Sequence, residues 1–580
     1  MKHLKAEKPG NWYRELKKLC TYDQMKIEKI VVNSISHMTD QEQVEAIADE
    51  FAKVRNEGFN PLKKEDIKIP YFSEYDVPVI TVETVKLHLS QLKTKPVKVK
   101  KMFSTEIAGP LTDIINTSIR RGEWPDCWKL EYATPVPKEY PPKSIEELRN
   151  ISSLKSCDKI AEKIIAKLIM EDMKPKLDPS QYANREGISI DHYLIKLIDR
   201  ILTTLETNSK DEALAVLATL IDWKQAFPKQ CPQLGIESFL ANGVRPALIP
   251  LLINYFQNRR MIVKWHNVTS VERKLDGGGP QGGTLGVWEY QSQSNDNANC
   301  VEPEDRFKWV DDLTLLEIIN MISIGISSYN IKNHVPSDIK THNQFIHEVN
   351  LKSQTYLEEI NDWTLQHKMA LNEKKTKNMI FNFTDKFQFS TRLNLNGKNI
   401  DVVEKTKLLG TIVTNDLNWE ENTASCVKKA QGRMQLLRKV ASFTTNKQDL
   451  LVIYKTFVRG ALEQSCTVWH SSLTKEQQSD LERVQKSALK VIMGKNYQSY
   501  ENACESLNIE DLSTRRTRLC LQFAKKCLYN NKMKSLFPRS SRKSKIATRH
   551  QEKYKVKLAR TEKLRKSAIP YMQKLLNDCN

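Results

Sequence analysis

The sequence lacks the features that mark several classes of protein. No run of apolar residues approaches the roughly 18–20 that a membrane span requires, and the N-terminal stretch MKHLKAEKPGNWYRELKKL has no continuous apolar segment. There is no internal repeat and no low-complexity tract. We therefore expect a soluble intracellular protein of the nucleus or cytoplasm rather than a membrane-spanning, secreted or repeat protein.

The cysteines also lack any recognisable pattern. The chain has 11 cysteines, but they form no CxxC pair and no Cys/His knuckle of the kind that binds zinc. Scattered cysteines of this kind are typical of reduced structural thiols in an intracellular compartment. No zinc site is expected.

Length and charge point to a multidomain protein with an acidic partner. A chain of 580 residues exceeds the roughly 250–300 at which a single core stops growing, so several domains are expected. Lys and Arg together number 90 against 70 Asp and Glu, a formal net charge of +20, with a pI of about 9.2. Such a surface favours binding to a polyanion such as nucleic acid; the alternative is that the excess serves solubility alone.

Two adjacent aspartates lie between two short apolar stretches in FKWVDDLTLL, Phe307 to Leu316. The flanks are rich in strand-forming residues, so the pattern predicts a hairpin that holds Asp311 and Asp312 at its turn. Carboxylates held in this way can bind Mg²⁺, which takes oxygen ligands. Taken alone, such a dipeptide is more often a surface turn carrying two solvated acids.

A second acidic strand end and a glycine-rich loop precede this hairpin. The apolar run ALAVLATLI immediately precedes Asp222, a pattern that predicts a buried strand with one carboxylate at its end. In the segment DGGGPQGGTLG, Asp276 to Gly286, five glycines directly flank Pro280 and Gln281, and glycine lets the backbone pass close to a ligand. By itself the loop is also compatible with a plain flexible connection.

Basic residues recur along the chain. Pro135 and Pro137 predict an extended segment that carries Lys138, and Arg149 precedes another short apolar stretch. A Lys and an Arg on neighbouring extended elements could together bind a triphosphate, although each residue alone could be an ordinary basic residue on the surface. The stretch PVKVKK (96–101) and the basic stretch 539–566 could likewise either contact nucleic acid or be solvated.

Helices and hairpins can be expected from local patterns elsewhere. Thr39 to Glu42 forms a capping-box pattern ahead of Val44, Ile47, Phe51 and Val54 at helical spacing, and we read residues 1–100 as helical scaffold. Amphipathic helices are expected over 107–121 and 354–371, and a hairpin at Asn396-Gly397. From about residue 422 onward the chain reads as helical and basic.

Taken together, three carboxylates in a basic protein favour nucleotidyl transfer. Joining a nucleotide to a growing strand requires activation of a 3′-oxygen and neutralisation of the departing pyrophosphate, which two metal ions roughly 3.5–4 Å apart can do. Carboxylates from two strands would bridge those ions. Lys and Arg would surround the triphosphate.

In this order the motifs resemble the reverse transcriptase of non-LTR (LINE-type) retrotransposons. WVDD at 309–312 is similar to the family's aromatic-x-Asp-Asp motif, and Asp222 to its first palm aspartate. Phe227 falls where these enzymes carry the bulky residue that excludes a ribose 2′-hydroxyl, and GGPQGGTLG resembles the family's G-x-PQG-x-x-LG loop. Trp309 enlarges the family's usual Tyr or Phe, and Pro228 replaces a frequent aspartate.

Further matches extend the resemblance over roughly residues 105–500. Lys138 and Arg149 look like the fingers residues that contact the incoming triphosphate, and Gln281 and Gly282 like loop residues beside the nucleotide and template. LNEKKTKNMIF resembles the palm's basic motif, in which Lys377 or Lys375 would act as general acid toward pyrophosphate. Segments 407–419 and 453–473 are similar to the primer grip and the helical thumb.

The resemblance implies an α+β right-hand polymerase with fingers, an antiparallel palm sheet, a helical thumb and mostly helical extensions. The expected segments are 1–104 (helical N-terminal region), 105–420 (fingers and palm), 421–535 (thumb) and 536–580 (basic extension). The implied reaction is RNA-templated DNA synthesis from a DNA primer and deoxynucleoside triphosphates. Asp222 and Asp311 would ligate Mg²⁺ (or Mn²⁺), with Asp312 in support.

Two other functions remain open at the level of sequence. One is a catalytically inactive nucleic-acid-binding remnant with the same fold, and the other is a maturase-like RNA chaperone. The sequence shows no upstream endonuclease domain and no recognisable RNase H acidic set, so a separate nuclease, the template and the oligomeric state stay undefined.

Overall fold

The structure, a computed structural model, describes residues 39–91, 103–138, 142, 144–207, 213–320, 339–383, 391–540 and 553–579. The stretch 96–101 and residues 541–552 of the basic stretch lie outside these ranges. Two compact units are present: Met1–Gln181, Trp223–Asn299 and Glu359–Asn372 form the first, and Tyr182–Asp222, Cys300–Glu358 and Glu373–Asn580 form the second. The segment 105–420 is thus shared between the units, and the four expected segments stay predictions.

The first unit combines a five-stranded sheet with helices. The sheet has the order β2-β1-β4-β5, with β6 paired to β4, and its pairs are antiparallel except β1 with β4. Its strands are β1 (Leu130–Pro137), β2 (Leu148–Ser153), β4 (Arg259–Trp265), β5 (Val268–Thr269) and β6 (Arg273–Leu275). Its helices are α3 (Asp40–Asn56), α4 (Val82–Ser90), α6 (Ser104–Arg121), α7 (Ser156–Met173), α9 (Pro232–Ala241), α10 (Ile249–Phe256) and α11 (Leu285–Gln293).

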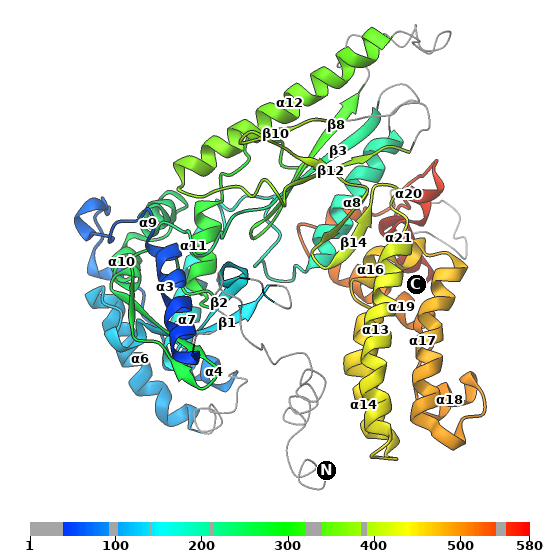
Figure 1. Cartoon of the computed structure of the whole chain (residues 1–580), viewed down its shortest axis with the longest axis horizontal. Helices are drawn as coiled ribbons and strands as arrows, with labels where there is room; N and C mark the ends of the chain where they lie inside the picture. The colour runs from blue at the N-terminus through cyan, green and yellow to red at the C-terminus, as the bar shows by residue number, and fades with distance from the viewer. Residues whose placement is uncertain are drawn as a thin grey trace. The chain divides into compact units, whose positions relative to one another are not determined.

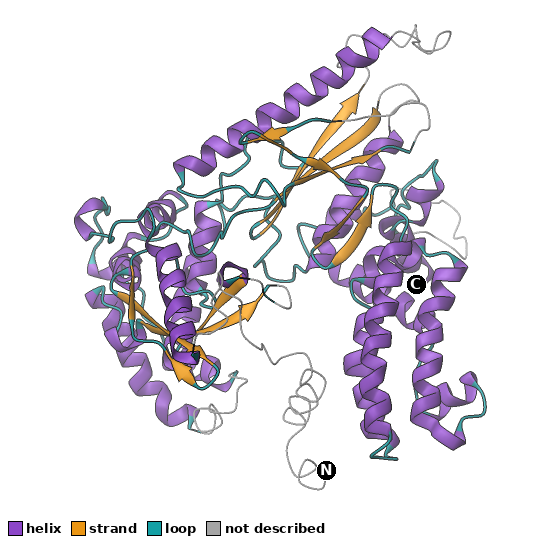
Figure 2. Ribbon diagram, in the orientation of Figure 1, coloured by secondary structure: helices purple, strands orange, loops and turns teal. Residues whose placement is uncertain are grey.

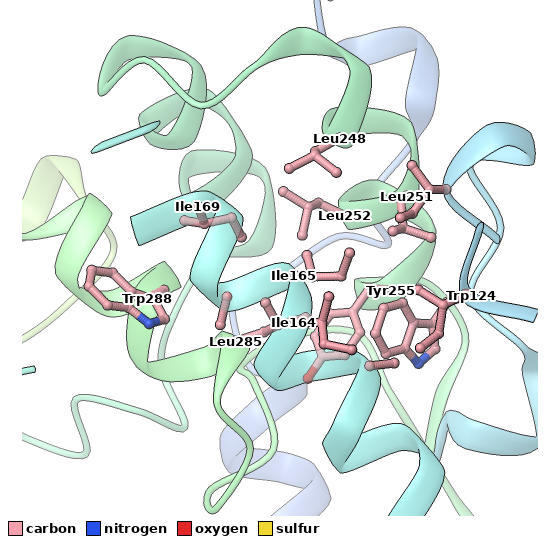
Figure 3. Close-up of a cluster of buried hydrophobic side chains, with 14 of the residues drawn as sticks. Trp124, Ile164, Ile165, Ile169, Leu248, Leu251, Leu252, Tyr255, Leu285 and Trp288 are labelled. Atoms are coloured by element: carbon pink, nitrogen blue, oxygen red, sulfur yellow. The ribbon is translucent and has the colours of Figure 1, made fainter. Parts of the chain in front are cut away.

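Two hydrophobic clusters hold this unit together. The larger one lies among α6, α7, α10 and α11, and Figure 3 shows Ile165 and Leu252 packed toward each other within it. In the smaller one α3 packs on the sheet through Val44, Ile47 and Phe51 against strand residues that include Val263. The capping box predicted at Thr39 and Glu42 is present and starts α3.

The second unit is built on another five-stranded sheet, of order β12-β9-β3-β8-β7, shown as orange arrows in Figure 2. All its pairs are antiparallel except β12 with β9. The strands are β3 (Ala213–Ile221), β7 (Arg306–Trp309), β8 (Asp312–Asn320), β9 (Lys377–Phe381) and β12 (Asp401–Val402). The hairpins β10 (Asn394–Leu395)–β11 (Lys398–Asn399) and β13 (Lys405–Leu408)–β14 (Thr411–Thr414) complete the strands.

Helix α8 (Ile190–Thr207) packs against this sheet, and the rest of the unit is helical after β14. Figure 1 shows α13 beside α17, as their packing contacts require. These helices are α13 (Glu420–Ala441), α14 (Lys447–Ile453), α15 (Arg459–Leu462), α16 (Cys466–Trp469), α17 (Lys475–Met493), α18 (Tyr500–Ser506), α19 (Leu512–Cys527), α20 (Glu562–Lys566) and α21 (Ala568–Asp578). The predicted α+β class, with an antiparallel sheet and a helical C-terminal region, is confirmed.

One local expectation agrees with the structure, and one helix has other bounds than expected. The hairpin at Asn396-Gly397 is present, with φ of 51° and 79° at its two turn residues. Helix α12 runs over Ile339–Gln366 rather than 354–371. It begins earlier and stops before Lys368, which has a φ of 56° and turns the chain out of the helix.

Part of the basic C-terminal stretch packs on the protein rather than standing in solvent. Lys557 donates to the carboxylate of Asp199 on α8, with Nζ–Oδ1 and Nζ–Oδ2 distances of 2.8 and 3.0 Å. The side chain of Glu206 accepts from the backbone N–H groups of Arg560 and Thr561. The described residues around Lys557 to Thr561 are therefore anchored to helix α8.

No helix of the described residues is long and apolar enough to cross a membrane.

Candidate active site

The two adjacent aspartates lie where the sequence predicts them, at the turn between β7 and β8. Trp309 pairs with Asp312, which leaves Val310 and Asp311 as a two-residue turn. Val310 has a φ of 56°, a left-handed conformation that is unfavourable for a β-branched residue. A positive φ at the first turn residue is typical of the tight turns that match the twist of a hairpin, and strained residues of this kind concentrate at functional sites.

Asp222 reaches the same end of this sheet from the neighbouring strand. β3 runs antiparallel to β8, with Ile221 opposite Leu313. Asp222 follows Ile221 and Asp312 precedes Leu313, so the two aspartates lie opposite each other at one end of the sheet. The backbone N–H of Asp222 donates to the Thr376 hydroxyl at 3.3 Å, which ties this strand end to the start of β9. The structure therefore gathers three carboxylates at one end of a rigid sheet.

The electrostatics of the site confirm that the three acids act on one another. The pKa of Asp312 is raised to about 7, mainly because burial penalises its charged form, and further because Asp311 and Asp222 repel its negative charge. Like charges crowded in this way favour binding of a cation, which would relieve their repulsion. Asp311 is exposed at the turn, whereas Asp222 and Asp312 are half-buried.

The donor set fits a hard divalent cation, because all three groups are carboxylates. Among the described residues, no group of three or more His, Cys, Asp or Glu side chains is already gathered around a common point in the way a metal site requires. The chemistry of the donors and the raised pKa of Asp312 thus favour a cation here, although the described side chains do not form a ready-made metal cage.

Lys377 is the predicted basic residue that lies in this sheet. It is the first residue of β9, pairs with Leu220 near the end of β3, and is half-buried. Its neighbour Thr376 accepts the hydrogen bond from Asp222. Lys375 lies just before β9 and is exposed.

The other predicted site residues belong to the first unit. Lys138 and Arg149 are on one hairpin, since Lys138 follows β1 directly and Arg149 on β2 pairs with Val136. Both are exposed, and the Lys138 ammonium donates to the Glu146 carbonyl at 2.7 Å. The proline-rich segment before Lys138 is the extended strand that the sequence predicts.

The glycine-rich loop lies against this hairpin. Ser152 of β2 donates its N–H to the Gln281 carbonyl at 2.8 Å. Gly282 has a φ of 127°, and a Cβ there would lie 2.8 Å from the Ser152 carbonyl oxygen. Glycine is required at this position by both the backbone conformation and the space. The loop therefore places Gln281 and Gly282 beside the strand that carries Arg149.

Phe227 packs on the helix that follows the same loop. Its ring stacks on Tyr290 of α11, with centroids 5.4 Å apart and planes at 29°. The chain after it turns tightly, and the carbonyl of Pro228 lies 2.6 Å from where a Cβ on Gly278 would be. The backbone at Pro228 therefore passes so close to residue 278 that a side chain there would collide with it.

Sequence reasoning missed a set of buried charged residues near this loop. Helix α3 buries Arg55 on its apolar face, whereas the predicted Val54 is half-exposed. Arg55 lies four residues after Phe51, so a charged residue in line with an apolar stripe was the available signal of a buried ion pair. Its partner is Glu131, on a strand 76 residues further along.

No protein-family model matches this chain. Among curated proteins it is 25% identical over 335 residues to the "Probable RNA-directed DNA polymerase from transposon BS" of Drosophila melanogaster, which covers 56% of this chain and 34% of that protein. It is 27% identical over 189 residues to the "Probable RNA-directed DNA polymerase from transposon X-element" of the same organism, covering 32% and 20%. The matched regions thus span about a third or less of the length of these relatives.

Two solved telomerase structures show weaker likeness. The apo telomerase of Candida tropicalis, truncated from its C-terminal domain, aligns with a TM-score of 0.32 and 10% identity over 54% of this chain and 59% of that one. The telomerase of Candida albicans in complex with a TWJ fragment of telomeric RNA aligns with a TM-score of 0.33 and 11% identity, over 67% of this chain and 68% of that one. Scores at this level do not establish a shared fold on their own.

The sequence matches agree with the resemblance that the motifs predict. Over the aligned residues, this chain is similar in sequence to two probable RNA-directed DNA polymerases of Drosophila transposons.

Proposed function

We propose that this chain is an RNA-directed DNA polymerase of a non-LTR retrotransposon, which extends a DNA primer on an RNA template. The observation that supports this most is that Asp222, Asp311 and Asp312 lie at one end of the second unit's sheet. Burial, and in addition repulsion by Asp311 and Asp222, raises the pKa of Asp312 there to about 7. In this proposal that sheet is the palm of a right-hand polymerase. The helices after β14 are its thumb, and the first unit supplies the fingers.

Asp222 and Asp311 would hold the divalent ions, Mg²⁺ or Mn²⁺, and Asp312 would support them. Bound metal ions of this kind activate the attacking 3′-oxygen and neutralise charge on the leaving pyrophosphate. Lys377, on the adjacent strand β9, or Lys375 just before it, would donate a proton to pyrophosphate; the pairing of Lys377 with Leu220 near the end of β3 supports the first choice. The chain's own contribution is a rigid sheet end that presents carboxylates and a lysine together.

The first unit would bind the nucleotide and template. Lys138 and Arg149 are exposed on one hairpin and would contact the triphosphate, since both are donors that pair with phosphate oxygens. Gln281 and Gly282 lie in a loop whose backbone is open to close approach. The formal charge of +20 would add attraction for the nucleic-acid backbone.

The test is primer extension by the purified chain on an RNA template with a DNA primer and deoxynucleoside triphosphates. We expect extension that requires Mg²⁺ or Mn²⁺ and stops on chelation. Salt-sensitive nucleic-acid binding without any metal-dependent product would overturn the polymerase proposal. That result would instead support an inactive binding remnant or an RNA chaperone.

Metal binding is expected to weaken as the pH falls through 7. The carboxylate of Asp312 must lose its proton to bind a cation, and its pKa of about 7 lets protons compete at pH 6 but not at pH 8. We expect the apparent affinity for Mn²⁺, followed by its paramagnetic signal, to fall by about tenfold from pH 8 to pH 6. Asp312→Asn is expected to remove this dependence, whereas an affinity in the parent chain that does not change with pH would contradict the assignment.

Phe227 is expected to discriminate against ribonucleotides. Phe227→Val replaces the ring that stacks on Tyr290 with a small branched side chain, and space opened beside a bound sugar would admit a 2′-hydroxyl. We expect ribonucleotide incorporation relative to deoxyribonucleotide to rise by about tenfold, in line with the modest discrimination that apolar contacts provide. Phe227→Tyr keeps the ring and serves as the control; equal discrimination in the Val and Tyr variants would show that Phe227 has no such role.

A further inference from the structure

Ionisable side chains that are almost completely buried lie around the glycine-rich loop, some in contact with it and others paired with those that are. Arg55, Glu131, Glu162, Arg259 and Glu289 are each at most 2% exposed. Buried charges are costly unless they are paired and hydrogen-bonded, so a group of this size needs a specific arrangement. All these residues lie in the first unit, and none of them takes part in the chemistry proposed above.

Arg55 connects helix α3 to the first part of the loop. Its Nε donates to the Gly277 carbonyl at 2.9 Å and one terminal nitrogen donates to the Gly278 carbonyl at 2.6 Å, while the other pairs with Glu131 on β1. A guanidinium can serve these three acceptors at once because its donors form a planar fork. One side chain thus joins the N-terminal helix, the sheet and the loop.

The loop approaches α3 so closely that only glycine fits. A Cβ on Gly277 would lie 2.2 Å from the Arg55 carbonyl oxygen and 2.4 Å from the Phe59 ring. Gly278 has a φ of 61°, and a Cβ there would also come within 3.2 Å of the Arg55 Nε. The glycines at 277 and 278 are therefore explained by contact with α3 and with Pro228.

The far end of the loop is held by buried side chains from other elements. Glu162 on α7 accepts the Thr284 N–H at 2.8 Å and the hydroxyl of Tyr255. Gln230 donates to the Gly286 carbonyl at 3.1 Å, and its own carbonyl accepts the Gly278 N–H at 2.9 Å. The loop is thus fixed at residues 277, 278, 284 and 286.

We propose that Arg55 is a positioning residue that sets the conformation of the glycine-rich loop and, through it, nucleotide binding. Helix α3, which the sequence suggested was only scaffold, would then help to position the loop of the proposed polymerase. The link to nucleotide binding rests on the proposed function, whereas the effect on loop conformation does not. Arg55 itself is buried and acts through the loop backbone.

Arg55→Lys separates this role from simple stabilisation. Lysine keeps a positive charge near Glu131 but cannot reach both loop carbonyls and the carboxylate together. We expect faster amide hydrogen exchange over residues 277–286, by about tenfold or more, with exchange over α10 unchanged. In primer extension we expect the KM for deoxynucleotide to rise by about tenfold, with a smaller change in kcat.

The matched control is Arg273→Lys. Arg273 also ties α3 to the unit, donating to Asp49 and Glu45 at 2.7 and 2.9 Å, but it is not among the side chains that hold the loop. We expect less than a twofold change in KM and unchanged loop exchange. Equal behaviour of the Arg55 and Arg273 variants would overturn the proposal.

Gly278→Ala provides a second, independent test that leaves Arg55 in place. The added Cβ must displace the loop from Pro228, so we expect the same rise in loop exchange and in KM. Combined with Arg55→Lys, its effect should be less than additive, because both changes release the same segment. Loop exchange that stays slow in the folded Arg55→Lys variant would refute the inference, whereas an inactive parent chain would refute only the polymerase proposal.

Discussion

Asparagine in place of Asp222 or of Asp311 is expected to lower primer extension by about a thousandfold or more. The amide keeps the shape of the side chain but removes the negative charge that a divalent cation requires. Losing several kcal/mol of metal-dependent stabilisation of the transition state corresponds to a rate change of this size. The measurement is the single-turnover rate of nucleotide addition at saturating Mg²⁺.

Two controls separate loss of the site from loss of the protein. The affinity for the RNA–DNA primer–template should stay within about twofold of that of the parent chain. This affinity comes mainly from attraction between the basic protein and the nucleic-acid phosphates, and removing one charge changes a net charge of +20 little. Glu302→Gln removes an exposed carboxylate just ahead of the same hairpin and should leave the rate unchanged. A variant of Asp222 or Asp311 that extends primers at nearly the parent rate would remove these residues from the catalytic site.

Glu131→Ala is expected to lower the free energy of unfolding by about 3–5 kcal/mol. Glu131 is fully buried, pairs with Arg55, and lies 3.9 Å from a terminal nitrogen of the equally buried Arg259. Removing the carboxylate leaves two guanidinium groups buried with less compensation, which is costly. This is a large part of the roughly 5–15 kcal/mol that stabilises a typical protein, and urea denaturation would measure it.

Asp126→Ala is the matched comparison for this loss. Asp126 also accepts from an arginine of β4, Arg260, at 2.7 Å, but this carboxylate is 72% exposed. An exposed pair of this kind is worth about 1 kcal/mol or less. Equal free energies of unfolding for the two alanine variants would contradict the prediction. They would show that other interactions compensate Arg55 and Arg259 when the Glu131 carboxylate is removed.

Local patterns in the sequence were enough to predict the elements that carry the candidate site. The apolar stretches around Asp311-Asp312 predicted the β7–β8 hairpin, and the run before Asp222 predicted β3, because strand residues and their end points are set by neighbours in sequence. The capping box at Thr39 and the Asn396-Gly397 turn follow from contacts within a few residues. The roles of the individual site residues stay predictions.

Features that depend on distant partners could not be predicted in this way. Helix α3 looked like scaffold because the groups that give Arg55 its role, Glu131 and the carbonyl of Gly277, lie 76 and 222 residues away. For the same reason the sequence left open whether the basic C-terminal stretch is solvated or contacts nucleic acid. Lys557 packs on α8 by pairing with Asp199, which lies 358 residues away.

The sequence by itself thus determined which residues could form a metal-dependent site, their order along the chain and the strand ends that hold them. Only the tertiary structure decided that Asp222 lies opposite Asp312 at one end of the sheet, that burial and the neighbouring acids raise the pKa of Asp312, and that the glycine-rich loop is fixed from α3. The physical reason is that strand ends and turns follow from short-range backbone preferences. Burial and charge pairing, in contrast, arise only when segments far apart in sequence are brought together by folding.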